Sequence, residues 1–146
     1  MTEIAFHFNA PDKLDYACRL LRKAVAAGSR VVVMASEQDL ARLDTLLWTF
    51  SKTDFLPHVC LPGSAEVIAV SPIVLTSQPA AADLPHREVL VNLGDTVPEG
   101  FEVYARVIEV VSLDDTDRLQ ARARWKYYTD HGYVIVRHDL KLKSAA

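Results

Sequence analysis

Glycine is scarce in this chain of 146 residues, which contains only five. Backbone amides approach a phosphate most closely in glycine-rich turns, yet neither GxxxxGKS/T nor GxGxxG occurs in the sequence. The turn after the first predicted strand reads HFNAPDK and contains no glycine. These absences argue against a bound nucleotide and against chemistry that depends on one.

Cysteine is also rare, and the two thiols, Cys18 and Cys60, are too far apart in sequence to suggest a metal-binding pair. We expect both to be reduced, buried small side chains of a cytosolic protein. The five histidines show neither HxH nor HExxH spacing, so the sequence predicts no metal site.

One weak nucleophilic arrangement is present in DFLPHVC, where Asp54 and His58 precede Cys60. In an extended strand, His58 and Cys60 would share one side of the strand, about 7 Å apart. The chain has no orienting motif such as GxSxG, and reactive residue types that merely occur together are weak evidence of catalysis. A capping or interface role for His58 is the better interpretation.

Long apolar runs and a strong charge of either sign are absent as well. No run approaches the roughly 20 residues of a membrane-spanning helix, and the N-terminal MTEIAFHF lacks the basic start of a signal peptide. The net charge is −3, from 16 basic and 19 acidic residues. This balance recruits neither nucleic acid nor acidic lipid globally, so any electrostatic site must be local. We expect a cytoplasmic protein.

Strand and helix signals alternate along the chain. Pro11 and Asp12 open a predicted helix after a first strand at 4–8, and Gly28 is placed to end that helix. The run RVVVMA is typical of a strand buried on both faces of a parallel sheet, and Ser36 follows it as the cap of the next helix. Later strands are predicted at 88–93, 106–112 and 133–136, with a helix from Asp114 or Asp115 to about His131.

This order of elements predicts an α/β fold. We expect a Rossmann-like, doubly wound, mainly parallel sheet flanked by helices, without a nucleotide-binding loop. Half of the residues are hydrophobic and about a quarter are charged, which is typical of a globular protein. The length allows one sizeable core, so the sequence predicts a single domain over residues 1–146.

The segment LDTLLWTFSKTDFLPH, residues 43–58, carries an aromatic side chain on the unexpected face of its helix. Trp48 lies roughly 120° from the middle of the core-facing stripe at 100° per residue. An exposed aromatic that is soon followed by Phe55 marks a partner surface more often than an accident of composition. The alternative is that a loop or the chain terminus folds over Trp48. The stripe itself consists of Leu40, Leu43, Leu47 and Phe50.

The last predicted helix presents a short basic ridge. Arg118, Arg122 and Lys126 recur every four residues, while the acidic residues collect at the helix start and leave the ridge unneutralised. Trp125 lies beside the ridge, next to an apolar face. Such a surface suits an acidic peptide with an aromatic anchor, or a carboxylate end. The alternative is that the ridge is only a solvated helix face. Duplex DNA is disfavoured as a ligand, because it would need a broader basic surface.

The order of elements, the segment LDTLLWTFSKTDFLPH and the later ARARWKYYTDHGY resemble the chi subunit family of bacterial DNA polymerase III. The similarity covers essentially the whole chain. Its most specific part is the Leu-Asp-x-x-Leu-Trp run followed by Phe-x-Pro-His. The resemblance implies a non-catalytic accessory subunit that pairs with the psi subunit to join the clamp loader during replication. It also implies binding of the acidic C-terminal tail of single-stranded DNA-binding protein.

The same resemblance assigns site residues. The psi interface would include Trp48, Phe55, Pro57 and His58, and the tail site would include Arg118, Arg122, Trp125 and Lys126. Two features depart from the family: residues 62–87 follow no family pattern, and Thr129 stands where some members have a basic residue. No cofactor or metal is implied, contact with nucleic acid is indirect, no membrane is involved, and the free chain is expected to be a monomer.

Two other hypotheses remain open. A small nucleotide-dependent or hydrolytic enzyme on a Rossmann-like fold would need a glycine-rich loop or a converging acid and base. A direct nucleic-acid binder would show strong salt dependence with naked single strands. The adaptor hypothesis accounts for the off-stripe Trp48 and for the basic ridge with two separate surfaces.

Overall fold

The computed structural model describes residues 2–49, 57–61, 71–78 and 84–140. Their strands and helices follow one another along the chain as β1 (Glu3–Ala10), α1 (Lys13–Ala26), β2 (Val31–Met34), α2 (Glu37–Thr49), β3 (His58–Cys60), β4 (Ile73–Thr76), β5 (Val89–Asn92), the 3-10 turn η1 (Phe101–Val103), β6 (Arg106–Ser112), α4 (Asp115–Asp130) and β7 (Ile135–Asp139).

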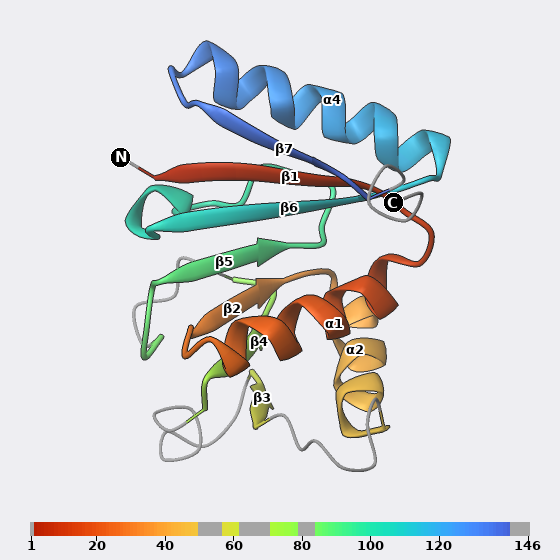
Figure 1. Ribbon diagram of the computed structural model, residues 1–146, viewed down its shortest axis with the longest axis vertical. Helices are drawn as coiled ribbons and strands as arrows, with labels where there is room; N and C mark the ends of the chain where they lie inside the picture. Colours follow the sequence, from red (N-terminus) through yellow and green to blue (C-terminus); the bar gives the residue numbers. More distant parts are fainter. Residues whose placement is uncertain (1, 50–56, 62–70, 79–83, 141–146) are drawn as a thin grey trace.

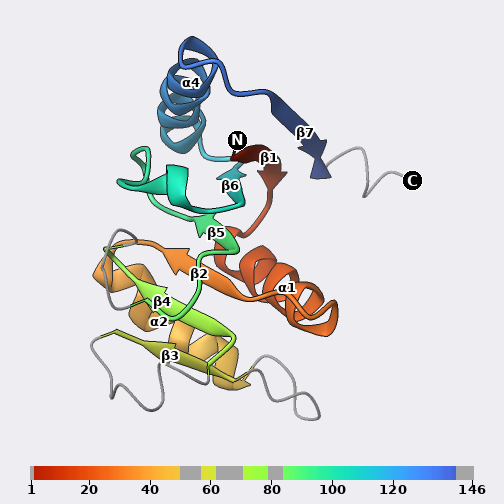
Figure 2. The same ribbon diagram turned by 90° about the vertical axis from the view of Figure 1, so that its left-hand side faces the viewer.

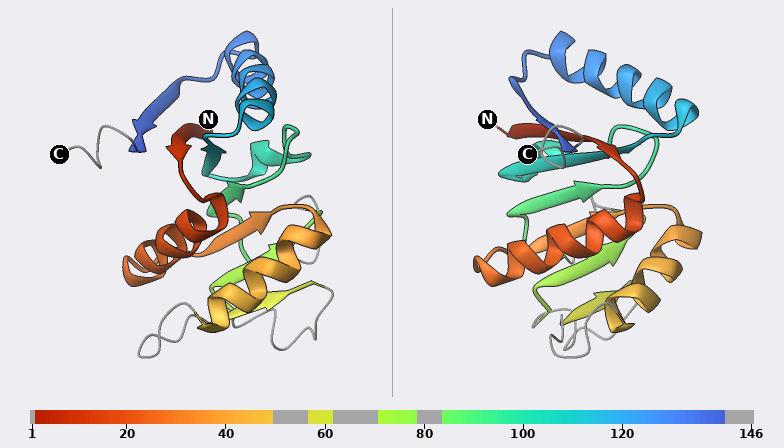
Figure 3. Two further views of the ribbon diagram at one scale, coloured as in Figure 1. Left: turned by 90° about the vertical axis from the view of Figure 1, so that its right-hand side faces the viewer. Right: turned by 45° about the vertical axis from the view of Figure 1, so that its right-hand side comes forward.

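The strands within these ranges form one seven-stranded, all-parallel sheet in the order β3-β4-β2-β5-β6-β1-β7 (Figure 1). Helices α1 and α2 lie side by side on one face of the sheet (Figure 3). Helix α4 packs on the opposite face, over β6 and β7 (Figure 2). The predicted α/β, doubly wound architecture is confirmed, and the sheet is wholly rather than mainly parallel.

Local sequence signals set several of these boundaries. Asp12 caps α1, because its carboxylate accepts the N–H of Asp15 at 3.1 Å. Ser36 caps α2 in the same way, since its hydroxyl accepts the N–H of Asp39 at 3.2 Å. Gly28 follows α1 with a φ of 83°, a left-handed conformation in which a side chain would be strained. All three assignments were predicted from the sequence and are confirmed.

The last strand is displaced from its predicted position at 133–136. It begins at Ile135 and continues to Asp139, because its backbone pairs with β1 from Ile4 to Phe8. The strand therefore includes the polar run RHD, which has low strand propensity by itself. Pairing with β1 therefore determined the position of β7, although the local composition favours an earlier strand.

The hydrophobic core has two layers, because successive strand residues face opposite sides of the sheet. Val31 and Val33 of β2 face α1 and α2, while Val32 between them faces the α4 side. Three of the four stripe positions predicted for α2 are buried there, and Phe50 lies outside the described residues. None of the helices in the described ranges is long and apolar enough to cross a membrane.

A buried carboxylate on β6 holds α4 against the sheet. Arg124 donates from Nε to Oε1 of Glu109 at 3.0 Å, and the Tyr128 hydroxyl donates to Oε2 at 2.7 Å. Asn92 of β5 donates from Nδ2 to the same carboxylate at 2.9 and 3.0 Å. Burial raises the pKa of Glu109, against the opposing influence of Arg124 and these hydrogen bonds. The cluster joins β5, β6 and α4 at one point, and sequence analysis did not identify it.

The Arg124 guanidinium is only partly satisfied. Its side chain is 2 % exposed, and its two terminal nitrogens find no hydrogen-bond partner among the described residues. Burying such groups without partners costs free energy, so the pair with Glu109 is not an optimal source of stability. Its main consequence is geometric: it fixes how α4 is rotated about its own axis.

We predict that Arg124→Ala lowers the free energy of unfolding by about 3–5 kcal/mol, because it leaves Glu109 buried without its cation. Urea denaturation measures this change. Lys126→Ala is the matched control on the same helix: its exposed ion pair with Asp130 should contribute less than about 1 kcal/mol. Equal effects of the two substitutions would contradict a structural role for the buried pair.

Candidate functional site

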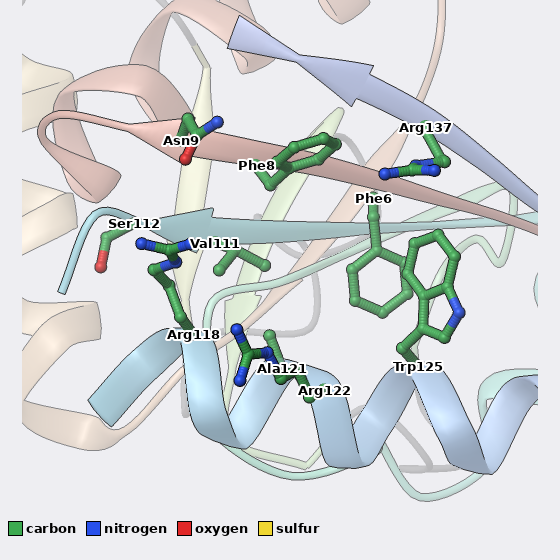
Figure 4. Close-up of a pocket in the computed structure, with 10 residues that line it drawn as sticks. All are labelled: Phe6, Phe8, Asn9, Val111, Ser112, Arg118, Ala121, Arg122, Trp125 and Arg137. Carbon is green, nitrogen blue, oxygen red and sulfur yellow. The ribbon is translucent and has the colours of Figure 1, made fainter. Parts of the chain in front are cut away.

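The fold creates a crevice where ligands commonly bind in open α/β sheets. Strands β1 and β6 are neighbours, but the helices that follow them, α1 and α4, cover opposite faces. Crevices form at the carboxyl ends of such a strand pair. Phe8 and Asn9 near the end of β1, and Val111 and Ser112 at the end of β6, line a pocket of about 400 Å³ at this point (Figure 4).

A bulge shapes the β1 side of the pocket. The register of β1 against β6 shifts between His7 and Ala10, and Asn9 adopts a positive φ of 66°. Asparagine is one of the few side chains that tolerate this conformation. The Asn9 amide donates to Oδ1 of Asp139 at 2.9 Å, which ties the bulge to the end of β7. Bulges commonly re-aim side chains beside functional sites.

The helix N-termini at this crevice carry the chain's own carboxylates. Asp12 caps α1, and Asp114 caps α4 by accepting the N–H of Asp117 at 3.0 Å. Lys13 at the start of α1 bonds to Oδ1 of Asp117 at 3.0 Å, and Oδ2 accepts the Ser112 N–H at 2.8 Å. Free helix N-termini attract phosphate, but these would repel it. The arrangement disfavours a nucleotide at the crevice.

Three arginines surround the pocket that lies beside those helix ends. Arg118 and Arg122 are one turn apart on α4, and Arg137 projects from β7 (Figure 4). No acidic side chain belongs to the described residues that line the pocket, and these three arginines form no ion pair with any described residue. The pocket is therefore locally positive although the chain has a net charge of −3.

Apart from Asn9 and Ser112, the rest of the pocket wall is apolar. Trp125 of α4 packs its ring against that of Phe6, with a centroid distance of 5.0 Å. Val111 of β6 and Ala121 of α4 complete this wall, next to Phe8. Arginine groups beside an aromatic cavity can hold carboxylates while the cavity accepts an apolar side chain. We call this surface the arginine pocket; it contains Arg118, Arg122 and Trp125, three of the four predicted tail-site residues.

The fourth residue of that set, Lys126, does not line the pocket. Its ammonium bonds to Oδ2 of Asp130 at 3.1 Å, one turn further along α4. The prediction of an unneutralised ridge is therefore wrong at Lys126, although both partners are largely exposed and the pair is weak. The residue that sequence analysis missed is Arg137, because the predicted strand ended at Val136 and left it unassigned.

A second surface lies at the β3 edge of the sheet. Trp48 of α2 is 57 % exposed, which confirms that it points away from the core. Its ring lies 5.0 Å from the ring of His58 on β3. Nε2 of His58 is 3.0 Å from Oδ1 of Asp44, which precedes Trp48 by one turn of α2. We call Asp44, Trp48, Pro57 and His58 the Trp48 surface, although the His58 side chain is only 1 % exposed and lies beneath Trp48 and Asp44 as their support. Phe55, also predicted there, lies outside the described residues.

The contacts of Cys60 do not favour nucleophilic catalysis. Burial raises the pKa of its thiol, and the charge of Asp44 raises it further. A reactive thiol needs the opposite shift, because the thiolate is the nucleophile. The Cys60 thiol donates to the backbone carbonyl oxygen of Leu61 at 3.9 Å, and Asp54 lies outside the described residues. Cys18 is buried, which raises the pKa of its thiol to about 11, and both cysteines are free.

Comparison with known proteins identifies the family. The family described as DNA polymerase III chi subunit, HolC, matches residues 1–136. The chain belongs to this family. A protein named DNA polymerase III subunit chi from Pseudomonas aeruginosa is 33 % identical over 129 residues, which cover 88 % of this chain and 87 % of the relative. Proteins of the same name from Haemophilus influenzae and Escherichia coli are 29 % and 25 % identical, over 83 % and 81 % of this chain and 83 % and 79 % of their own lengths.

Membership of the chi family associates the chain with DNA replication, as an accessory subunit of a polymerase holoenzyme. The most specific sequence segment of the resemblance also has a structural explanation. Asp44 and Trp48 belong to the Leu-Asp-x-x-Leu-Trp run, and His58 ends the Phe-x-Pro-His run. The fold brings these two runs into contact on the Trp48 surface.

The Trp48 surface and the arginine pocket lie at opposite edges of the sheet. The former involves β3 and the latter β7, which are the two outermost strands of the sheet formed by the described residues (Figure 1). The two surfaces therefore do not overlap on this chi-family chain.

We predict that Asp117→Asn lowers the free energy of unfolding at pH 7 by about 1–2 kcal/mol, measured by urea denaturation. Burial tends to raise the pKa of Asp117, but the Ser112 N–H and the Lys13 ammonium outweigh it, and the pKa lies below its usual value. A carboxylate shifted in this direction stabilises the fold above its unfolded-state pKa, about 3.9. That contribution disappears as the pH falls through the folded-state pKa.

The difference in the free energy of unfolding between wild type and Asp117→Asn should therefore become smaller as the pH is lowered below about 4. Asp130→Asn is the control, since its ion pair with Lys126 is exposed. A gap that stays constant from pH 7 to pH 3 would contradict the proposed ionic contribution.

Proposed function

We propose that this chain is a non-catalytic adaptor of the DNA polymerase III holoenzyme. On this proposal one α/β domain binds the psi subunit through the Trp48 surface and the acidic C-terminal tail of single-stranded DNA-binding protein through the arginine pocket. The observation that carries the proposal is the arginine pocket, whose described lining includes no acidic residue and which lies beside a crevice whose own helix ends carry carboxylates. The apolar wall beside the arginines suits a carboxylate-bearing peptide with an apolar side chain better than a free phosphate.

Several features of the arginine pocket support an acidic peptide as its ligand. Arg118 and Arg122 present planar guanidinium groups, which bind carboxylates through paired hydrogen bonds. The wall of Phe6, Val111 and Trp125 can accept one aromatic or aliphatic side chain. A peptide with several carboxylates and a terminal phenylalanine meets both requirements. Lys126 would then contribute charge only from outside the pocket.

The Trp48 surface supports a protein partner in a different way. Trp48 is a large exposed aromatic side chain, and its ring is supported by the ring of His58. Aromatic residues held in place before binding are frequent hot spots of protein interfaces, because little conformational freedom is lost on association. Phe55 and Pro57 remain predicted members of this interface.

The competing hypotheses receive less support. An enzyme would need a converging acid, base and nucleophile, whereas burial raises the pKa of the Cys60 thiol, the opposite of what a nucleophilic cysteine needs. A direct nucleic-acid binder would need a broad basic surface. The arginine pocket is a local cavity of about 400 Å³ on a chain of net charge −3.

We predict that Trp48→Ala weakens the association with purified psi subunit at least about 30-fold, as expected for a hot-spot aromatic worth about 2 kcal/mol. The fold should be unaffected, with a melting temperature within about 2 °C of wild type, because the side chain faces away from the core. Pull-down and titration calorimetry measure the first effect, and thermal unfolding measures the second.

Leu119→Ala is the matched control for that experiment, since Leu119 is a similarly exposed apolar residue on α4 at the other end of the sheet. It should leave psi binding unchanged. Unchanged psi binding by Trp48→Ala, or loss of its fold, would refute the assignment of the Trp48 surface.

We predict that Arg122→Glu weakens binding of an acidic peptide that ends in phenylalanine at least about 30-fold, because a repulsive charge replaces a carboxylate-binding fork. Fluorescence anisotropy of a labelled peptide measures the affinity. Arg19→Glu on α1 makes the same change in net charge on an exposed residue paired with Asp15, and should have little effect. If both variants lost the same peptide affinity, the loss would be a long-range effect of net charge, and it would contradict binding at the arginine pocket.

A further inference from the structure

Arg137 differs from the other pocket arginines in the element that carries it. Its position on β7 is paired with Phe6 of β1, and Phe8 is two residues further along β1. Paired residues of parallel strands, and residues two apart on one strand, project from the same face of a sheet. Arg137 therefore lies on the α4 face, beside Phe6 and Phe8, and lines the pocket (Figure 4).

The guanidinium of Arg137 packs against two aromatic rings. Its Cζ lies 5.8 Å from the ring centroid of Phe8 and 5.6 Å from that of Trp125. These contacts are within the range of cation–π attraction and restrict the side chain without using its N–H groups. Arg137 forms no ion pair with any described residue. The N–H fork of a partly immobilised cation is thus available at the edge of the apolar wall.

Arg118 and Arg122 approach the same cavity from α4, whereas Arg137 approaches it from β7 (Figure 4). A ligand whose apolar side chain packs against the wall between Arg137 and the two α4 arginines has a cation on each side. Asp139, two residues after Arg137, accepts a hydrogen bond from Asn9 at the end of β1 and does not line the cavity. Arg118 and Arg122 are therefore positioned by the packing of α4, whereas Arg137 is positioned by its contacts with two aromatic rings.

We propose that Arg137 is the opposing half of a carboxylate clamp and a specificity-determining residue of the arginine pocket. This inference rests on the proposed function, because its ligand is the acidic, phenylalanine-ended peptide. The clamp binds carboxylates on both sides of an aromatic anchor: one through Arg137, the other through Arg118 and Arg122. Peptides that carry a carboxylate on one side only are bound weakly.

The test compares Arg137→Gln and Arg137→Lys by anisotropy titration with a labelled acidic peptide ending in phenylalanine. Arg137→Gln should weaken binding about tenfold or more, because it removes a charge-assisted, bidentate contact. Arg137→Lys keeps the charge but loses the planar fork, so its affinity should be intermediate. Titration at several salt concentrations adds a second readout: the Arg137→Gln variant should show a shallower loss of affinity with salt, since one fewer ion pair forms.

Arg19→Gln is the control for loss of one exposed arginine away from the pocket, and should bind the peptide like wild type. Thermal unfolding of the two Arg137 variants checks that β7 is intact. If wild type binds the peptide and Arg137→Gln binds it equally well with the same salt dependence, the clamp is overturned while the proposed function stands. If wild type does not bind the peptide at all, both the proposed function and the clamp fail.

Discussion

The buried bond between Glu109 and Arg124 is the constraint on which the arginine pocket depends. It ties one face of α4 to β6 in a place where Tyr128 and Asn92 also bond to the same carboxylate. A helix that is fixed in rotation presents a defined set of side chains to the neighbouring space. With Arg124 turned towards the sheet, the adjacent face of α4 brings Arg118, Arg122 and Trp125 to the cavity. The polar core group thus specifies orientation more than it adds stability.

Charge is distributed unevenly around the switch point between β1 and β6. The ends of α1 and α4 carry carboxylates, with Asp117 bridging Lys13 and the Ser112 backbone. The cavity beside them is lined by three arginines and by no acidic residue of the described set. A fold that often binds nucleotides at this position therefore has the opposite electrostatic preference at its helix ends. Anions are instead attracted to the arginine pocket, where an apolar side chain can bind as well.

The Trp48 surface shows how two short sequence runs become one feature. Asp44 and Trp48 are one helical turn apart, so they share a face of α2 regardless of the rest of the fold. His58 joins them only because β3 lies alongside α2, where its ring contacts Trp48 and its Nε2 meets Asp44. His58, for which the sequence favoured a capping or interface role over catalysis, thus supports the ring of an exposed aromatic residue.

Features that depend on local geometry could be predicted from the sequence: the caps Asp12 and Ser36, a cap of α4 at Asp114 or Asp115 (Asp114 in the structure), the left-handed turn at Gly28, the strand at 106–112 and the outward direction of Trp48. These follow from side-chain spacing and hydrogen bonds within a few residues. The position of β7, the burial of Glu109 with Arg124 and the place of Arg137 in the pocket depend on which strands become neighbours. The pairing of Lys126 with Asp130, four residues along the same helix, is local and can be recognised from its spacing. The contacts between β1, β6, β7 and α4 join residues up to about 130 positions apart, and no local pattern encodes them.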